Sequence, residues 1–191
     1  MQTDYIWENN GYTMRSFRLE DKEEYYICGF SEWDCEVARL TGSKQHYEKD
    51  EIDAYFLNCL TDVSRFDFLI FNPQGRIIGE SVINNLDNET RSANFRICIF
   101  HSADCGQGIG GWAVRMTRDF AFRELMLHRL SLDVFSFNPR AKRAYEKAGF
   151  RVEGVLRDAI RDGDSYADDI LMSILEDEWK SRSSTEQDIR S

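Results

Sequence analysis

The sequence predicts an α/β fold built on one mixed β-sheet, and three observations support this prediction. Three short apolar runs in the middle of the chain are separated by turn-forming residues, which indicates an antiparallel meander. Over residues 112–127 the apolar positions take the spacing of a helix, and residues 130–137 are again typical of a strand. Because a strand, a helix and a further strand in this order form a parallel pair, the sheet is expected to be antiparallel at first and parallel in one place.

The segment before the meander is expected to contribute one strand and two helices. Residues 12–17 alternate weakly between polar and apolar and are predicted to form the strand. Residues 19–33 begin with a charged turn, which is typical of a helix N-terminus. A break at residues 41–43 separates them from a second helical stretch, roughly residues 45–60.

The meander itself is predicted at residues 66–71, 76–84 and 92–100, with turns at 72–75 and 86–89. Beyond residue 137, Pro139 marks the first turn of another helix, which is expected to end at Gly149. Residues 150–160 and 166–175 flank Asp162 and Gly163 and are predicted to form a closing hairpin. We therefore expect a single domain over residues 1–179 and a polar tail over residues 180–191 that frays.

The charge balance bears on the class of ligand. The 191 residues include 34 acidic and 24 basic side chains, which give a formal net charge of −10. This balance argues against general nucleic-acid binding, since such binding depends on Lys and Arg that neutralise phosphates. It permits a cationic substrate, although an acidic surface is also common for solubility alone.

The five cysteines predict reduced thiols rather than disulfides or a metal site. Their number is odd and no C-x-x-C pair occurs. Reduced thiols are typical of the cytoplasm. An acidic residue lies near the start of the chain, and no apolar run approaches the roughly 20 residues that a membrane span needs. We therefore expect a cytoplasmic protein without a signal peptide or a membrane partner.

A glycine-rich segment, Cys105-Gly106-Gln107-Gly108-Ile109-Gly110-Gly111, lies between a predicted strand and a predicted helix. Glycine amides approach an anion closely, and the first turn of a helix offers free N–H groups, so a phosphate ligand is expected. The segment also fits the dinucleotide pattern G-x-G-x-x-G, with Asp133 near the position of a ribose-binding acid. A meander before the loop and only about 80 residues after it disfavour that fold. A tight turn without a ligand is a third interpretation.

A second motif, N-P-R-A-K-R-A-Y-E-K-A-G-F over residues 138–150, begins 32 residues after Gly106. Together the two segments resemble the GCN5-related N-acetyltransferases (the GNAT family). The first is similar to that family's pyrophosphate-binding pattern, (Arg or Gln)-x-x-Gly-x-(Gly or Ala), and the second to its N-x-x-A-x-x-x-Y-E-K-x-G-F segment. The C-terminal part resembles the branch that contains ribosomal-protein N-terminal acetyltransferases and spermidine N-acetyltransferases.

The resemblance implies the acyl-CoA N-acyltransferase fold, a twisted mixed sheet of about seven strands flanked by about four helices. It also implies acetyl-CoA as the cofactor, direct transfer of the acetyl group to a primary amine, and a homodimer. The acceptor would be a polyamine, another small amine or a protein N-terminus. Two alternatives are an antibiotic acetyltransferase and a non-catalytic sensor that binds acetyl-CoA.

For the cofactor, the resemblance implies that the amides of Gly106 to Gly111 hold the pyrophosphate. Backbone groups of the strand before the loop would pair with the pantetheine arm as an added strand does, and Asn138 would bind the pantetheine amide. Basic side chains on the following helix would neutralise cofactor phosphates, although a solvated helix face explains them equally well. The residues expected to bind the cofactor are Ile97, Cys98, Ile99, Cys105, Gly106, Gln107, Gly108, Ile109, Gly110, Gly111, Asn138, Arg140, Arg143 and Tyr145.

For the chemistry, the resemblance makes Tyr145 the general acid, because a tyrosine with a pKa of about 10 stays protonated at neutral pH. Several relatives carry a glutamate as base where this chain has Asn94, so Glu80 on the neighbouring strand is the expected replacement, acting through a water. The alternative is that Tyr145 is a core aromatic and Glu80 a surface carboxylate. Cys105 stands where the family usually has Arg or Gln. A nucleophilic role for it is disfavoured because no nearby histidine supports it, and His101 is interpreted as a loop residue.

The substrate side is expected around the segments at residues 28–36 and 41–43, since acidic and aromatic side chains there can bind a cationic amine. The expected substrate-binding residues are Trp33, Asp34, Glu36 and Asp169. The three carboxylates are also alternative bases, and a capped helix end is an equally good explanation of this segment.

Overall fold

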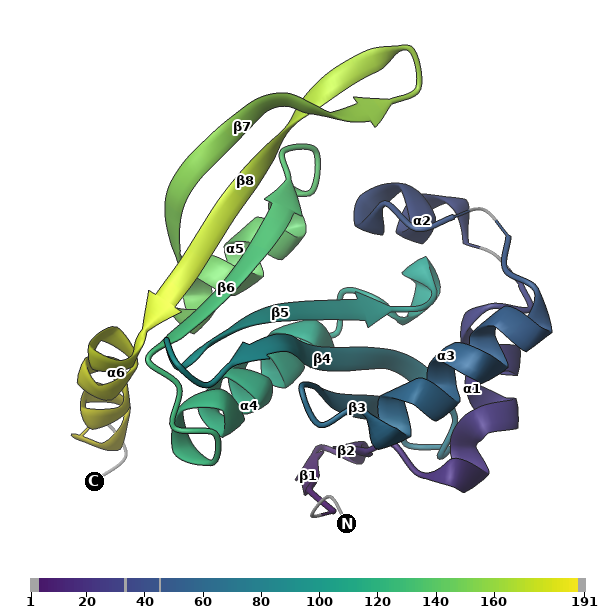
Figure 1. Cartoon of the computed structure of the whole chain (residues 1–191), viewed down its shortest axis with the longest axis horizontal. Coiled ribbons are helices and arrows are strands. Elements are labelled where there is room, and N and C mark those ends of the chain that lie inside the picture. Colours follow the sequence, from purple (N-terminus) through teal and green to yellow (C-terminus); the bar gives the residue numbers. More distant parts are fainter. Residues whose placement is uncertain (1–3, 33, 45, 189–191) are drawn as a thin grey trace.

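The computed structural model describes residues 4–32, 34–44 and 46–188, and at its centre is one sheet with the strand order β1-β2-β3-β4-β5-β6-β8-β7 (Figure 1). The pairs β1–β2 through β4–β5 are antiparallel, β5–β6 is parallel, and β8 pairs antiparallel with both β6 and β7. The strands are β1 (Ile6–Asn9), β2 (Tyr12–Ser16), β3 (Phe66–Phe71), β4 (Ile77–Asp87), β5 (Ser92–Ile99), β6 (Arg129–Phe135), β7 (Arg151–Asp162) and β8 (Ser165–Leu175). The predicted mixed sheet is confirmed.

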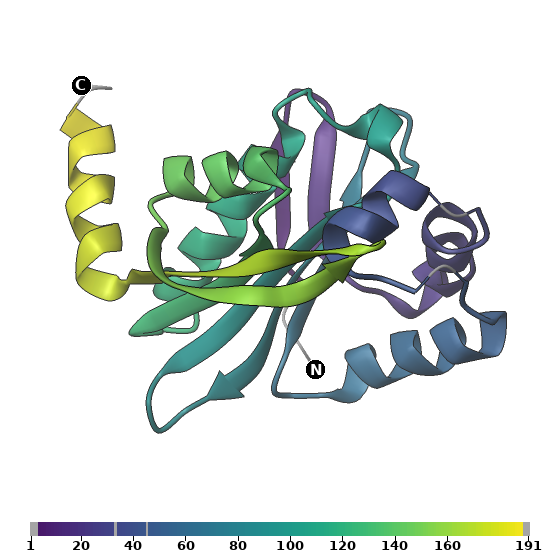
Figure 2. The ribbon, with the colours of Figure 1, turned by 90° about the horizontal axis from the view of Figure 1, so that it is seen from above.

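Helices cover both faces of this sheet (Figure 2). Helices α4 and α5 lie on one face and α1 and α3 on the other, while α2 lies near the tip of the β7–β8 hairpin. The helices are α1 (Lys22–Gly29), α2 (Cys35–Thr41), α3 (Lys49–Thr61), α4 (Ile109–Arg123), α5 (Pro139–Ala148) and α6 (Glu176–Asp188), with short 3₁₀ turns at Leu19–Asp21 and Ser102–Asp104.

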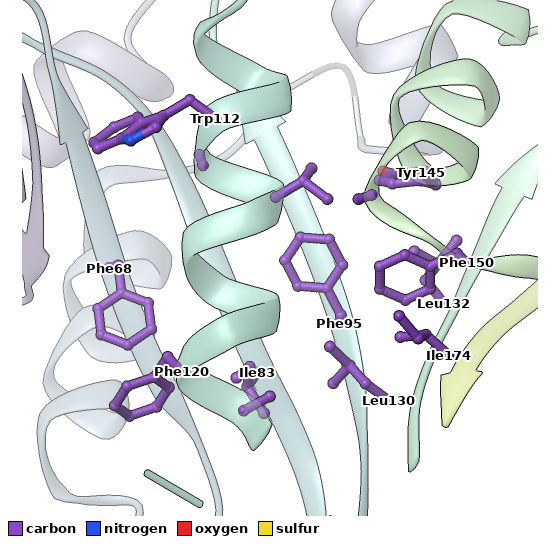
Figure 3. Packing of buried hydrophobic residues seen from close by; sticks show 14 of the residues in the cluster. Phe68, Ile83, Phe95, Trp112, Phe120, Leu130, Leu132, Tyr145, Phe150 and Ile174 are labelled. Atoms are coloured by element: carbon purple, nitrogen blue, oxygen red, sulfur yellow. The ribbon is translucent and has the colours of Figure 1, made fainter. Parts of the chain in front are cut away.

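The core is divided by the sheet into two clusters, and the alternation along β3 shows why. Phe68 and Ile70 pack in the cluster on the α4 side, whereas Leu69 and Phe71 pack in the cluster on the side of α1 and α3. Side chains of a strand alternate between its two faces, so a continuous apolar run is expected where both faces are covered. Figure 3 shows the first cluster, in which Phe120 of α4 lies against Phe68.

The strands β5 and β6 separate after a short ladder. Their pairing consists of Ser92 with Arg129, Ala93 with Leu130 and Asn94 with Ser131. Beyond that point the two strands diverge (Figure 1), so the β6-facing backbone groups of residues 95–99 have no strand partner in the described chain. This divergence opens the sheet at its centre.

The element counts exceed the expected seven strands and four helices. Strand β1 was not predicted, although the Asn10-Gly11 dipeptide that joins it to β2 is a strong hairpin signal and both residues have positive φ. The helix expected over residues 19–33 ends at Gly29, and α2 is a separate helix. The helix expected from residue 45 begins at Lys49, and residue 45 itself lies outside the described residues.

Residues 180–188, the described part of the expected polar tail, belong to α6, which runs to Asp188, and the fraying of the tail stays a prediction. Trp179 anchors this helix to α4. Its ring stacks on Phe122 with centroids 5.3 Å apart, and its Nε1–H donates to Asp119 over 2.8 Å. An amphipathic side chain thus holds a polar helix against the domain.

Candidate active site

A cavity of about 780 Å³ lies where β5 and β6 diverge. Its walls come from both sides of the sheet opening and from five helices. One half is lined by the start of α4 and by α5, and the other by α1, α2, α3 and β4. The cavity therefore connects the glycine-rich loop with the part of the molecule that precedes it in sequence.

The glycine-rich loop is shaped by two residues with left-handed backbone. Gly106 has φ = 89° and Gly108 has φ = 82°, a region that other residues rarely adopt. Gly108 is the N-cap of α4, and its carbonyl accepts the N–H of Trp112 at 3.0 Å. The N–H groups of residues 109–111 form the first turn of α4 and have no partner within the helix. They line the cavity and are available to an anion.

The space beside the loop is open. A Cβ built on Gly106, Gly108 or Gly110 would meet no atom within 4 Å. Crowding by protein atoms is therefore not the reason why this loop is rich in glycine. Open space beside free amides is what close approach of a phosphate requires.

Basic side chains surround this half of the cavity. Arg115, Arg140, Arg143 and Lys147 line it, and no carboxylate pairs with the three arginines among the described residues. Sequence reasoning missed Arg115. It lies four residues after Gly111, hence on the same helix face, and its Nη1 is 3.7 Å from where a Cβ of that glycine would lie.

Three predicted cofactor residues deserve separate placement. Gln107 does not line the cavity, because its Oε1 accepts the Tyr12 hydroxyl at 2.6 Å on the outer side of the loop. Cys105 lines the cavity, and its Sγ lies 3.7 Å from the carbonyl oxygen of His101. Asn138 caps α5 by accepting the Ala141 N–H on Oδ1 at 3.1 Å, which leaves its NH₂ group as a donor.

The strand segment predicted to hold the pantetheine arm borders the cavity. Ile97, Cys98 and Ile99 line it, and they belong to the part of β5 that has separated from β6. Burial raises the pKa of the Cys98 thiol, so this thiol stays protonated. The free strand edge, the unpaired cations and the open loop together suit a long ligand that carries phosphates at one end.

Tyr145 projects from α5 into the same cavity. Its side chain is 7% exposed, and its ring lies edge-on to Phe95 and Phe150 at 6.2 and 6.0 Å (Figure 3). No described residue forms a hydrogen bond with its hydroxyl. Burial, with a smaller effect of Asp133, raises the pKa of Tyr145, so the phenol keeps its proton at neutral pH.

Glu80 lies on β4 and lines the cavity, only 6% exposed. It accepts a hydrogen bond from the Tyr25 hydroxyl at 2.7 Å and one from the guanidinium of Arg96 at 3.2 Å. Asn94 does not line the cavity, and its side-chain amide donates to Asn84 at 3.3 Å. Of these two strand positions, only the one occupied by Glu80 presents a carboxylate to the cavity.

Comparison with known proteins shows the family of this chain. The family model of the acetyltransferase (GNAT) domain matches residues 12–151. The chain belongs to the GNAT acetyltransferase family. It is therefore an N-acetyltransferase that uses acetyl-CoA to acetylate an amine, as predicted, and the loop, the cations and the free edge of β5 fit that cofactor.

Two curated relatives are N-acetyltransferases by name. The probable N-acetyltransferase YjcK of Bacillus subtilis is 30% identical over 138 residues, which are 72% of this chain and 69% of that protein. The spermidine N(1)-acetyltransferase of Vibrio cholerae is 29% identical over 141 residues, 73% of this chain and 81% of that protein.

A solved structure shows the same fold. The spermidine N-acetyltransferase from Vibrio cholerae, crystallised in complex with CoA and spermine, superposes with a TM-score of 0.79. The match covers 90% of this chain and 99% of that one, at 24% identity. Within the described part of this N-acetyltransferase, none of the helices is long and apolar enough to cross a membrane.

The residues predicted to bind substrate are placed less favourably in this N-acetyltransferase. Trp33 lies outside the described residues. Glu36 does not line the cavity; it is exposed and lies 3.8 Å from Arg39. Asp169 does not line the cavity either. Burial raises its pKa, with a further effect of Asp133, and its Oδ1 is buried without a hydrogen-bond partner.

Asp34 lines the cavity, but its carboxylate is fully used as a cap. Oδ1 accepts the N–H groups of Glu36 and Val37 at 3.0 Å, and Oδ2 accepts the N–H of Ser102 at 2.8 Å. The Ser102 and cap hydrogen bonds lower the pKa of Asp34 to about 2. A carboxylate this acidic is a poor base, so the geometry favours the capped helix end over a catalytic role.

Proposed function

We propose that this N-acetyltransferase acetylates a small cationic amine of the polyamine kind, with Tyr145 as proton donor and Glu80 as base through a water. The observation that carries the proposal is that one cavity is lined by the phosphate-binding loop, by Tyr145 and by Glu80. Acetyl-CoA, when bound, supplies an activated acetyl group whose leaving group is a thiolate.

The cofactor half of the cavity would bind the phosphates through the amides of residues 106–111 and through the unpaired guanidinium groups of Arg115, Arg140 and Arg143. The free edge of β5 at residues 97–99 would pair with the pantetheine arm, and the Asn138 amide would donate to one of its carbonyls. Preorganised backbone N–H groups of this edge are also suited to stabilise negative charge on the acetyl oxygen.

Glu80 would remove the proton that keeps the amine unreactive. An alkylammonium has a pKa of about 10.4, so the acceptor must be deprotonated before it attacks. A carboxylate in a largely enclosed cavity can take that proton through one water. Tyr145, which stays protonated, would then give its hydroxyl proton to the departing sulfur.

The acceptor half of the cavity favours a cation because its own cations are neutralised. Arg96 pairs with Glu80 at 3.2 Å, and Lys44 pairs with Glu51 at 2.7 Å. Asp133 lines the cavity without a hydrogen-bond or ion-pair partner among the described residues. The charge left over is therefore negative. The similarity to a spermidine acetyltransferase supports the same acceptor class.

The acceptor is tested by thiol release with a panel of amines: putrescine, spermidine, spermine, an aminoglycoside and a basic peptide with a free N-terminus. We expect the polyamines to give a kcat/KM at least about tenfold above the others, equivalent to about 1.4 kcal/mol of discrimination. A preference for the peptide would indicate a protein N-terminus, and a preference for the aminoglycoside an antibiotic acetyltransferase.

The base is tested by the pH dependence of kcat/KM in E80Q. We expect this variant to lose about 10²-fold or more in rate and to lose the acidic limb of the profile. The matched control is E153Q, because Glu153 of β7 forms a solvent-accessible ion pair with Arg129 of β6. This variant should keep both the rate and the acidic limb of the profile. An acidic limb that survives unchanged in E80Q rules out Glu80. The homodimer stays a prediction of the resemblance, and the cytoplasmic location stays a prediction of the cysteine pattern and of the other sequence features given with it.

A further inference from the structure

The Glu80 carboxylate is held by a different donor on each oxygen. Tyr25 of α1, which is fully buried, donates its hydroxyl proton to Oε2 at 2.7 Å. Arg96 of β5 donates from Nη2 to Oε1 at 3.2 Å. The side chain thus has one fixed orientation, with a neutral donor on one oxygen and a cation on the other.

Arg96 is itself held in place. Its Nη2 also donates to the Tyr55 hydroxyl, a short hydrogen bond that reaches from β5 to α3. The same hydroxyl oxygen accepts from Nη2 of Arg65 at 2.6 Å. Arg65 in turn forms a two-pronged pair with Asp67, with Nε–Oδ2 at 2.7 Å and Nη2–Oδ1 at 2.6 Å.

These contacts form one continuous chain of hydrogen bonds, Asp67–Arg65–Tyr55–Arg96–Glu80–Tyr25. Two guanidinium groups converge on one phenol oxygen, which their mutual repulsion opposes. The arrangement is tolerated because each cation has its own carboxylate, so the cluster is neutral overall. Guanidinium groups do not give up protons in proteins, so the chain cannot relay a proton; it can only hold charges in place.

A role in stability alone explains this cluster poorly. Replacing buried ion pairs by apolar side chains of similar volume is often neutral or stabilising. Here the cluster spans two helices and three strands, and four of its members, Tyr25, Tyr55, Glu80 and Arg96, line the cavity. Arg96 keeps 46% of its side chain exposed, although it lies beside a nearly buried carboxylate.

We propose that Arg96, clamped by Tyr55, and Tyr25 are positioning residues that hold the Glu80 carboxylate in one orientation in the cavity. This inference rests on the proposed function for its role in the reaction. The positioning of Glu80 by its hydrogen bonds can be tested whether or not Glu80 acts as the base.

The charged and titratable groups that surround Glu80 single out Arg96. They come from every element packed against it: Tyr25 of α1, Tyr55 and Cys59 of α3, Asp67 of β3, and Arg96 and Cys98 of β5. Burial raises the pKa of the two phenols and of the two thiols, that of Cys59 to about 12, so all four are neutral at pH 7. Asp67 already pairs with Arg65. Arg96 is therefore the one cation among these groups that is paired with Glu80.

The experiment observes the Glu80 carboxyl directly, by ¹³C NMR of the full chain with labelled glutamate at pH 7. The Glu80 resonance is assigned by its disappearance in E80Q. We expect R96Q and Y25F each to move this resonance, because each variant removes one of the two hydrogen bonds that hold the carboxylate. R91Q, which removes an exposed arginine paired with Glu176, is the matched control and should leave the resonance unchanged.

A conservative variant separates charge from geometry. R96K keeps the positive charge beside Glu80 but removes the guanidinium. Both hydrogen bonds of Arg96, to Tyr55 and to Glu80, come from Nη2, and the shorter lysine side chain does not place its ammonium there, so kcat should still fall, by about tenfold. Y55F, which removes the oxygen that clamps Arg96, should behave like R96K. Circular dichroism and CoA binding establish that each variant is folded.

The outcomes separate this inference from the proposed function. A Glu80 resonance that is the same in wild type and in R96Q overturns the inference. A resonance that moves in R96Q, while kcat does not fall, supports the positioning of Glu80 by Arg96 and refutes Glu80 as the base. A resonance that moves together with a fall in kcat supports the inference and the proposed base together.

Discussion

The two halves of the cavity are built in different ways. The cofactor half is made of two short segments, residues 106–115 and 138–147, and of the free edge of β5 at residues 97–99, with backbone groups and helix termini prominent in all three. The acceptor half is made of single side chains from α1, α2, α3, β4 and β5. A site built from backbone is encoded locally, whereas a site built from side chains exists only after the chain has folded.

The halves also differ in how their charges are balanced. In the cofactor half, Arg115, Arg140 and Arg143 have no carboxylate partner among the described residues. In the acceptor half, Arg96 and Lys44 are each paired. The first half is thus prepared for an anion from outside, in a chain whose net charge is −10, and the second for a cation or a neutral amine.

Tyr145 lies at the junction of the halves, and its replacement should give the largest effect. Y145F should lower kcat by about 10²-fold or more, because the leaving sulfur loses its proton donor. The dissociation constant of acetyl-CoA should stay within about twofold, since the phenyl ring still packs against Phe95 and Phe150. Thiol release and calorimetric titration measure the two quantities.

Tyr166 supplies the matched control, because it is a tyrosine on β8 with 65% of its surface exposed. Y166F should leave both quantities unchanged. An unaltered kcat in Y145F would refute the assignment of Tyr145 and leave it as a core aromatic that borders the cavity.

The features that could be predicted from the sequence are those that depend on neighbouring residues, as the cofactor half of the cavity does. The order of the central strands, the cap at Gly149 and the loop at residues 106–111 all depend on neighbours in sequence, and their prediction was correct in outline. Strand β1 was missed because the hairpin signal at Asn10-Gly11 was overlooked. Helix α6 was missed because it is held by a tertiary contact, the stacking of Trp179 on Phe122.

The acceptor half could not be predicted because its contacts join residues far apart in sequence. Tyr25 and Glu80, separated by 55 positions, meet only through the packing of α1 on the sheet. Arg96 reaches Glu80 through the register of β4 on β5, which sets Glu80 opposite Cys98. Asp34 was expected to bind substrate because nothing in the sequence shows that Ser102, 68 positions away, would occupy its carboxylate.

Substitution of two glycines of the loop should distinguish the need for a left-handed backbone from the need for open space beside it. The expected effects on activity are smaller than that of Y145F. In G108A the positive φ of 82° becomes strained at about 1–2 kcal/mol, so both stability and cofactor affinity should fall. G110A should instead stabilise the free protein by about 0.5–1 kcal/mol, because the position is helical and its Cβ meets no protein atom within 4 Å. The same Cβ should weaken acetyl-CoA binding by about tenfold, because it takes the space of a phosphate.

Thermal unfolding and calorimetric titration of the same samples measure these effects. G75A, at a turn far from the cavity with φ = 78°, is the control that should lose stability without losing cofactor affinity. If G110A binds acetyl-CoA as the wild type does, the phosphates do not approach this part of the loop.

The smallest effect is expected at Asp34, which ties α2 to the Ser102 turn at the edge of the acceptor half. D34A should cost about 1 kcal/mol of unfolding free energy, as the loss of a helix N-cap does, and should raise the KM of the amine about threefold with the acetyl-CoA affinity unchanged. The folded-state pKa of about 2 lies below the ordinary 3.8, so the carboxylate stabilises the fold fully above pH 4, and this contribution is lost as the pH falls from about 4 towards 2. The difference in urea midpoint between wild type and D34A should therefore be constant from pH 7 to about pH 4 and shrink below it. If the difference in urea midpoint grows on acidification, Asp34 is not the ionised cap. If the acetyl-CoA affinity falls together with that of the amine, the two halves of the cavity are not independent.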